Sequence, residues 1–216
     1  MKHFLSEDDR NYLEQKIKDA EKGTNLQIVL ATTGRSDSYA EIPWKAFATG
    51  VSAASLLVFA GHMASPVWFT VTTLLLSVVA ILIAGSLSAI LAIFWPRFAR
   101  IFLSGMRSQT ETLRYAASLF LERELFATEN RTGILLLISK FERKIVILPD
   151  KGLDTRLSKE ATENIISRMS GYMHQRKVRQ AFEAGLDELC SIISGNTEMH
   201  SAKNELSDEI IERDEL

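Results

Sequence analysis

The chain has 216 residues, of which 46% are hydrophobic and 24% charged, and its net charge at pH 7 is −2. These averages are typical of a globular protein with about one domain. The balanced charge argues against a dedicated nucleic-acid-binding protein, which usually has a basic excess, and the single cysteine, Cys190, excludes an intramolecular disulfide framework and a cysteine-rich zinc site.

The chain opens with a predicted helix and strand. Ser6 is a favourable N-cap, and the acidic residues after it favour the positive end of a helix dipole. Gly23 is expected to end this helix, as a C-terminal glycine does. One face of the helix is apolar, at spacings of four and three residues: Leu13, Ile17 and Ala20. Residues 26–32 are aliphatic and β-branched, which predicts a strand.

Residues 46–96 contain no Asp, Glu, Lys or Arg. A bilayer core about 30 Å thick needs about 20 apolar helical residues, so this stretch has room for two transmembrane spans. We predict spans at roughly 47–60 and 67–95, joined by a turn at 61–66 where Gly and Pro cluster. The alternative is a buried hairpin inside a soluble helical protein, which would require a larger surrounding shell than the rest of the chain supplies.

The basic residues flanking this stretch predict its orientation. Two precede it and three follow it, whereas the turn between the spans contains no Lys or Arg; the five are Arg35, Lys45, Arg97, Arg100 and Arg107. The positive-inside rule then places both chain ends in the cytosol. Trp44, Trp68 and Trp95 lie near the predicted span ends, as interfacial aromatic residues do.

After the spans, we predict a helix that continues to about Phe126 and then two strands. The apolar face of this helix is expected to consist of Leu113, Ala117, Phe120, Leu121 and Leu125. Residues 134–138 are apolar at every position, which indicates a strand buried on both faces of a sheet. Residues 144–150 form the next strand, and the short connection at 140–143 predicts a β-hairpin.

Two amphipathic helices and an acidic tail complete the chain. The first helix begins after an N-cap at Ser158, and the second begins near Val178. The inward positions are expected to be Ile165, Ile166, Met169, Tyr172 and Met173 in the first helix, and Phe182, Leu186, Leu189 and Ile193 in the second. Residues 198–216 carry seven acidic and two basic residues, which predicts a disordered tail or a frayed helix.

The sequence contains few groups that suggest catalysis. No phosphate-binding glycine loop, nucleophile elbow or histidine pair with metal-ligand spacing is present. Asp150 and Asp154 follow the end of a strand, and their carboxylates could hold a divalent cation such as Mg²⁺ or Ca²⁺ or position a water. They are therefore our candidates for both catalytic and metal-binding residues. The alternative is a plain turn, because Asp and Gly favour turns for local backbone reasons.

Four segments resemble the TPM domain family. The first two are 4–9, which opens the first helix, and 21–29, which leads into the first strand; the others are 132–139 and 142–153. The layout is also similar to the bacterial members in which a membrane hairpin interrupts the domain after the first strand. The resemblance implies an α/β fold, an α/β/α sandwich with a mixed sheet.

The same resemblance bears on function. Some plant members are acid phosphatases, and other members are accessory proteins of membrane complexes. Members commonly carry an Asp pair before the opening helix, where this chain has residues 1–3, Met-Lys-His. They also have a Gly-x-Gly after the third strand, where this chain has Asp150-Lys151-Gly152. Only Asp150 could replace a family acid.

We therefore expect a domain interrupted by an anchor. The expected parts are 1–42 and 98–197, which form the TPM-like domain, 43–97, which form a transmembrane helical hairpin, and the tail 198–216. The expected function is that of a non-enzymatic accessory or interaction module of a membrane complex in the bacterial inner (cytoplasmic) membrane. Its partners would be membrane lipid and another membrane protein, with no nucleic acid. The alternative is a weak metal-assisted phosphatase at the cytosolic membrane surface.

Overall fold

A computed structural model describes residues 5–64, 70–128, 130–175, 177–194 and 210–213 of the chain. By their contacts these residues divide into two compact units. Unit 1 comprises residues 1–37 together with 108–216, and unit 2, which we call the hairpin unit, comprises residues 38–107. Each unit is described by itself.

Unit 1 is built on a mixed sheet whose strand order is β3-β2-β1-β4. Its strands are β1 (Gln27–Thr33), β2 (Gly133–Ser139), β3 (Lys144–Pro149) and β4 (Ile211–Arg213). Strands β1 and β2 are parallel over seven residues, from Gln27 opposite Gly133 to Thr33 opposite Ser139. The predicted hairpin of β2 and β3 is confirmed, with Leu136 opposite Ile147.

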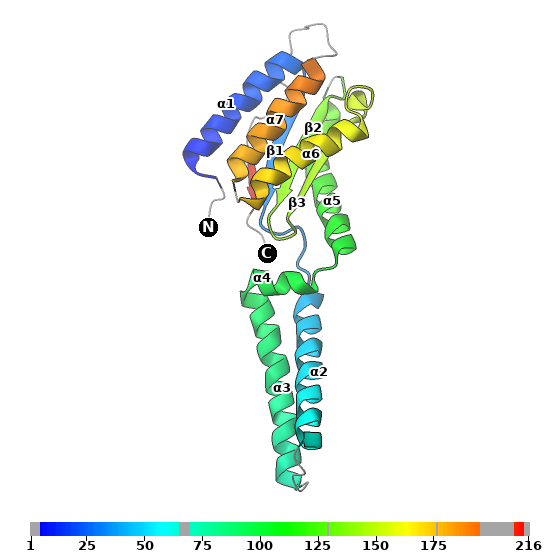
Figure 1. Cartoon of the computed structure of the whole chain (residues 1–216). Coiled ribbons are helices and arrows are strands. Elements are labelled where there is room, and N and C mark those ends of the chain that lie inside the picture. The colour runs from blue at the N-terminus through cyan, green and yellow to red at the C-terminus, as the bar shows by residue number, and fades with distance from the viewer. Residues whose placement is uncertain (1–4, 65–69, 129, 176, 195–209, 214–216) are drawn as a thin grey trace. The chain divides into compact units, whose positions relative to one another are not determined.

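Helices cover both faces of this sheet (Figure 1). They are α1 (Glu7–Thr24), α5 (Gly105–Glu122, whose first residues belong to the hairpin unit), α6 (Lys159–His174) and α7 (Val178–Ser194). Alternate residues of β1 and β2 enter different cores, because successive strand side chains point to opposite faces. Leu30 and Leu136 pack with α1, α6 and α7, whereas Ala31 and Leu137 pack with α5. The predicted α/β sandwich with a mixed sheet is confirmed.

Helices α1 and α6 begin where the sequence predicts, but the end of α1 and the inward face of α6 differ in detail. Ser6 caps α1 by accepting a hydrogen bond from the Asp9 amide. The left-handed cap at the end of α1 is Asn25 rather than Gly23, because Asn also tolerates a positive φ, here 57°. In α6 the Ser158 cap is confirmed, whereas Tyr172 is 38% exposed and does not point into the core.

The helix predicted from Arg97 to Phe126 is wrong as one element. The chain instead forms α4 (Pro96–Ala99) and a short 3₁₀ helix, η1 (Arg100–Phe102), before α5 begins; a second 3₁₀ helix, η2 (Leu125–Ala127), follows α5. The predicted apolar face is confirmed at Phe120 and Leu125 and wrong at Leu113 and Leu121, because the inward side of α5 is lined mainly by small and hydroxyl side chains that hydropathy overlooks. The buried residues are Ser108, Thr112, Ala116, Leu119 and Phe120, while Leu113 and Leu121 are exposed.

The acidic tail contains a short strand that the composition does not predict. Residues 198–209 and 214–216 lie outside the described residues, but Ile211–Arg213 pairs with Ala31–Thr33 of β1 as the parallel strand β4. Ile210 and Ile211 are buried, and Arg10 forms an ion pair with Glu212 at 2.7 Å. The prediction of a tail without stable structure is therefore wrong for this segment, because two adjacent isoleucines complete the two cores.

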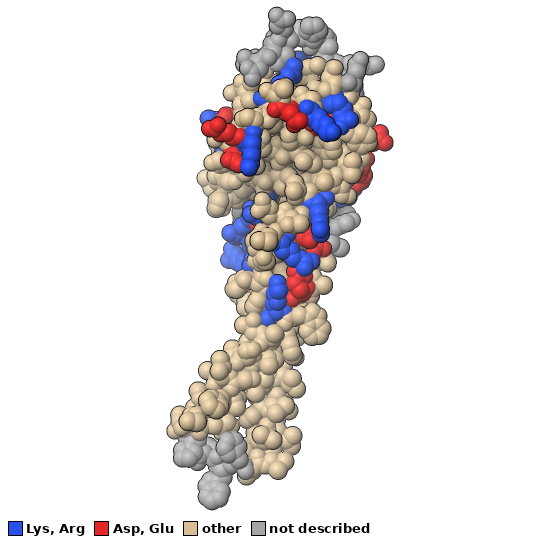
Figure 2. Space-filling view, turned by 90° about the vertical axis from the view of Figure 1, so that its right-hand side faces the viewer, with Lys and Arg blue, Asp and Glu red and all other residues tan. Residues whose placement is uncertain are grey.

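The hairpin unit consists mainly of α2 (Glu41–Ala64) and α3 (Val71–Phe94), each of 24 residues. Helix α2 begins and ends beyond the predicted span, and Gly61–Ala64, expected to start the turn, are still helical; the end of the predicted turn lies outside the described residues. The helices pack closely at two glycines. A Cβ added to Gly50 would collide with Ser88, and one added to Gly85 would collide with Val51 and Phe47. Beyond Lys45 neither helix contains a charged residue, and the lower part of the hairpin unit in Figure 2 shows none outside the grey atoms.

We predict that Leu136→Asp unfolds unit 1, whereas Leu121→Asp is tolerated. Leu136 has no exposed surface and lies between two strands, so an aspartate there would bury an unpaired charge at a cost of more than about 4 kcal/mol. Leu121 is 62% exposed on α5. Limited proteolysis of the two purified variants in detergent measures the difference, and equal protease resistance would contradict the two-sided core.

Candidate functional site

The predicted site residue Asp150 lies at the end of β3 and is held by Arg131. The Arg131 guanidinium donates from Nε to Oδ2 at 2.7 Å and from Nη2 to Oδ1 at 3.0 Å. The Lys151 amide also donates to Oδ1, at 2.8 Å. The Asp150 side chain is 5% exposed, whereas that of Arg131 is 48% exposed. Both carboxylate oxygens of Asp150 are thus engaged in hydrogen bonds.

These bonds fix the ionisation state of Asp150. Burial opposes the charged form, but the hydrogen bonds from Arg131 and the Lys151 amide, with the positive charges of both residues, outweigh it and hold the Asp150 pKa below its ordinary value. The same pair raises the pKa of Arg131 above its ordinary value, chiefly through the hydrogen bond to Asp150. The two side chains therefore form a stable ion pair at neutral pH.

The main chain around this pair is closely packed. The Asp150 amide donates to the Gly133 carbonyl at 2.9 Å, and the Gly152 amide donates to the Arg131 carbonyl at 3.0 Å. A Cβ at Gly152 would collide with the backbone of Asn130 and Arg131, so only glycine fits there without a shift. The segment that resembles the family motif is accordingly a tight joint between the start of β2 and the end of β3.

The second predicted site residue, Asp154, is not part of this joint. It follows a short 3₁₀ helix, η3 (Lys151–Leu153), and is exposed. Among the residues that the structure describes, no group of three His, Cys, Asp or Glu side chains is placed to hold a metal ion. A cation at Asp150 would have to compete with Arg131 for the carboxylate, so the predicted divalent cation has no prepared ligand set here, and its binding stays a prediction.

A buried polar cluster, which hydropathy and motifs do not indicate, lies at the other end of the sheet. Ser139 ends β2, and its hydroxyl donates to Glu142 Oε2. The Ser36 amide donates to Glu142 Oε1 at 2.8 Å, and the Ser36 hydroxyl donates to the Ser139 hydroxyl at 3.1 Å. The cluster extends to α5 through Thr112, whose hydroxyl lies 3.4 Å from the Ser36 hydroxyl and is the alternative acceptor for its single proton.

This Ser36–Ser139–Glu142 cluster is closed rather than open to a substrate. Ser139 has no exposed surface and Glu142 is 7% exposed, so neither is accessible as a nucleophile or base. The hydrogen bonds instead tie together the loop after β1, the β2–β3 turn and α5. A sequence signal existed, because Thr33 and Ser139 are polar residues at the carboxyl ends of neighbouring parallel strands, where sites often form in α/β sheets.

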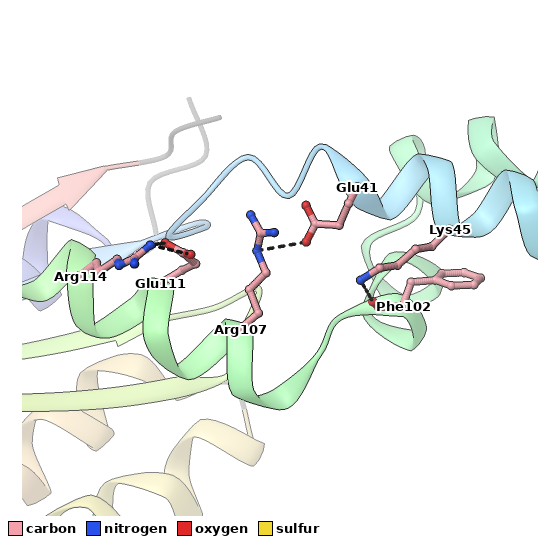
Figure 3. Close-up of polar contacts among 6 residues, drawn as sticks. All are labelled: Glu41, Lys45, Phe102, Arg107, Glu111 and Arg114. Carbon is pink, nitrogen blue, oxygen red and sulfur yellow. Dashed lines mark hydrogen bonds and ion pairs between the residues drawn. The ribbon is translucent and has the colours of Figure 1, made fainter.

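A third group of polar residues lies where α2 begins and α5 starts (Figure 3). Within the hairpin unit, Arg107 forms an ion pair with Glu41 at 3.1 Å, and its guanidinium lies 5.9 Å from the Tyr39 ring centroid. The Lys45 ammonium donates to the Phe102 carbonyl at 3.4 Å. These contacts join the chain entering the hairpin to the chain leaving it.

The fold and these contacts define a class of protein: an α/β sandwich domain whose sequence is interrupted, between two paired parallel strands, by two long apolar helices. Comparison with known proteins finds a family match over part of the chain. Residues 101–192 match the family model of the TPM domain. The resemblance to the TPM domain drawn from the sequence motifs is confirmed over these residues.

A solved structure shares this fold. It is the NMR structure of the BA42 protein from the psychrophilic bacterium Bizionia argentinensis, which superposes with a TM-score of 0.58 over 98% of this chain and 97% of that chain, at 13% sequence identity. At this identity the likeness concerns the fold alone. No curated protein matches the chain.

We predict that Asp150→Asn lowers the free energy of unfolding of unit 1 at neutral pH and removes part of the loss of stability that the wild type shows in acid. Because the Asp150 pKa is depressed in the folded state, its stabilisation is present above the ordinary Asp pKa of about 4 and is lost as the pH falls through the folded value. The half-exposed Arg131 limits the loss to about 1 kcal/mol at pH 7.

Denaturant unfolding of the full chain between pH 7 and pH 3 measures this effect. Asp154→Asn is the matched control, since Asp154 is exposed and its loss should change the free energy of unfolding by less than about 0.5 kcal/mol. Identical pH profiles for wild type and Asp150→Asn would show that the ion pair contributes nothing to folding.

Proposed function

We propose that the chain is an integral membrane protein whose α2–α3 hairpin anchors a TPM domain on the cytosolic side of the bacterial inner membrane. There the domain acts as a non-enzymatic interaction module of a membrane complex. The observation that carries the proposal is the exposure of apolar side chains on α2 and α3.

These two helices are long and apolar enough to cross a membrane. Only 6% of the most apolar segment of each helix is buried inside the structure. The core helix of a soluble protein would be mostly buried, so these helices do not behave as one. Leu74, Leu75 and Leu76 are consecutive and are 58, 59 and 64% exposed. Because consecutive helix residues point about 100° apart, apolar surface is exposed around most of α3. Lipid is the solvent that suits such a surface.

The contacts of Asp150 support the interaction role over catalysis. Its carboxylate binds Arg131, and the buried Ser139 and Glu142 bond within their own cluster, so both polar groups contribute to holding loops together. A weak phosphatase would require a carboxylate or hydroxyl that reaches substrate. The proposed role in a membrane complex rests on the membrane anchor and on these polar groups, whose hydrogen bonds are made within the protein.

We predict that both ends of the chain lie on the side of the membrane opposite to the α2–α3 turn. In a Cys190→Ser background, which removes the single cysteine, an added cysteine is the sole thiol. A membrane-impermeant maleimide applied to spheroplasts should label His62→Cys at once, and label Lys22→Cys and Lys203→Cys only after lysis. Labelling of Lys22→Cys and Lys203→Cys from opposite sides would contradict the hairpin.

We also predict that the chain, purified at native expression in mild detergent after cross-linking, recovers a reproducible membrane protein partner in near-stoichiometric amount. A variant in which a Gly/Ser linker replaces residues 46–96 is the matched control, and it should be recovered in the soluble fraction with less of that partner. Recovery of the full-length chain alone would contradict the interaction module.

A further inference from the structure

The charges of the hairpin unit gather at one end. Within residues 38–107 there are four basic residues and one acidic residue, Glu41, and none of these lies in 46–96. Helix α2 therefore begins with Glu41 and Lys45 and then runs uncharged from Ala46 to Ala64, about 28 Å at 1.5 Å per residue. This length is close to the hydrocarbon thickness of a bilayer, which places Lys45 at its edge.

The cations at this end have different partners. Arg107 is neutralised by Glu41 at 3.1 Å. Lys45 is exposed and donates to the Phe102 carbonyl, a neutral acceptor that leaves its positive charge uncompensated. Arg97 is exposed on α4, and α4 contacts α2. Lys45 and Arg97 are thus two exposed positive charges at the same end of the unit.

Two exposed tryptophans accompany these charges. Trp44 precedes Lys45 and is 73% exposed, and Trp95, two residues before Arg97, is 53% exposed. Indole rings prefer the headgroup level of a bilayer, where their apolar surface and N–H group are both accommodated. The aromatic and basic side chains are therefore best accommodated at the same depth in the bilayer, at the level of the lipid phosphates.

We propose that Trp44, Lys45, Trp95 and Arg97 form a binding site for the headgroup of an anionic phospholipid in the leaflet at the basic end of the hairpin. This inference rests on the proposed membrane anchoring. The two cations would bind the phosphate and the net negative charge of the headgroup, and the indoles would border its glycerol region. A zwitterionic headgroup offers a phosphate but no net charge, so it would bind more weakly.

Tryptophan quenching tests the proposal on the full chain. With Trp68→Phe, only Trp44 and Trp95 remain as emitters, since the chain has three tryptophans. The protein is reconstituted in phosphatidylcholine bilayers that contain the same fraction of brominated phosphatidylcholine or brominated phosphatidylglycerol. The expected result is a relative affinity for phosphatidylglycerol at least about fivefold higher, which corresponds to about 1 kcal/mol, the contribution of one cation near an anionic surface. Raising the salt concentration should reduce this preference.

Matched variants assign the preference to its residues. Lys45→Gln with Arg97→Gln should equalise the two lipids. The pair Arg107→Gln with Glu41→Gln, which leaves the net charge unchanged, should retain the preference, as should Lys22→Gln with Lys159→Gln in unit 1, which removes the same amount of charge from exposed lysines.

Three outcomes overturn the proposal. Equal quenching by the two brominated lipids in the Trp68→Phe chain, or a preference that survives the loss of Lys45 and Arg97, would leave the anchor intact and remove the headgroup site. Absence of quenching by either lipid would show that the hairpin does not insert, and both proposals would fall.

Discussion

The parallel pairing of β1 with β2 is the constraint on which the rest of the molecule depends. Seven residues of each strand are in register, although residues 34–132 separate them in the chain. Parallel neighbours cannot be joined by a tight turn, so the chain must leave the sheet and return to its other end. Here that crossover contains the whole hairpin unit as well as α5. A long insertion in this crossover is compatible with the pairing, because the pairing requires only that the crossover return the chain to the start of β2 beside β1.

The polar groups at the two ends of this sheet have the same structural role, which is to hold neighbouring segments together. At one end, Arg131 and Asp150 lock the start of β2 to the end of β3; at the other, Ser36, Ser139 and Glu142 lock the loop after β1 to the β2–β3 turn. Buried polar groups destabilise a fold unless their hydrogen bonds are made, and in both places they are made within the protein. Asp150, Ser139 and Glu142, which lie in the segments that resemble the family, thus hold loops, while the exposed apolar surface and the exposed cations Lys45 and Arg97 occur in the hairpin unit.

Features that depend on residues close together in the chain were predicted correctly, whereas features that depend on distant residues were not. The cap at Ser6, the two-sided burial of 134–138 and the spacing of Phe182, Leu186, Leu189 and Ile193 were correctly predicted, because capping and periodicity report a continuous segment and one buried face. The inward face of α5 was predicted only in part, with Phe120 correct, because Ser108 and Thr112 are buried although they are polar. The buried Ser139–Glu142 contact was missed for the same reason: hydropathy does not indicate which polar residues have found partners.

The amino-acid sequence by itself determined that two apolar helices interrupt an α/β domain, because the absence of charge over 46–96 and the strand and helix periodicities are properties of contiguous residues. It also indicated the resemblance to the TPM domain, which the family model matches over residues 101–192. Only the tertiary structure decided that Asp150 is bound by Arg131, that Ser36 meets Glu142, and that Ile211–Arg213 extends the sheet beside β1. Each of these contacts joins residues that are distant in the chain or not paired by any periodicity, so folding alone brings them together.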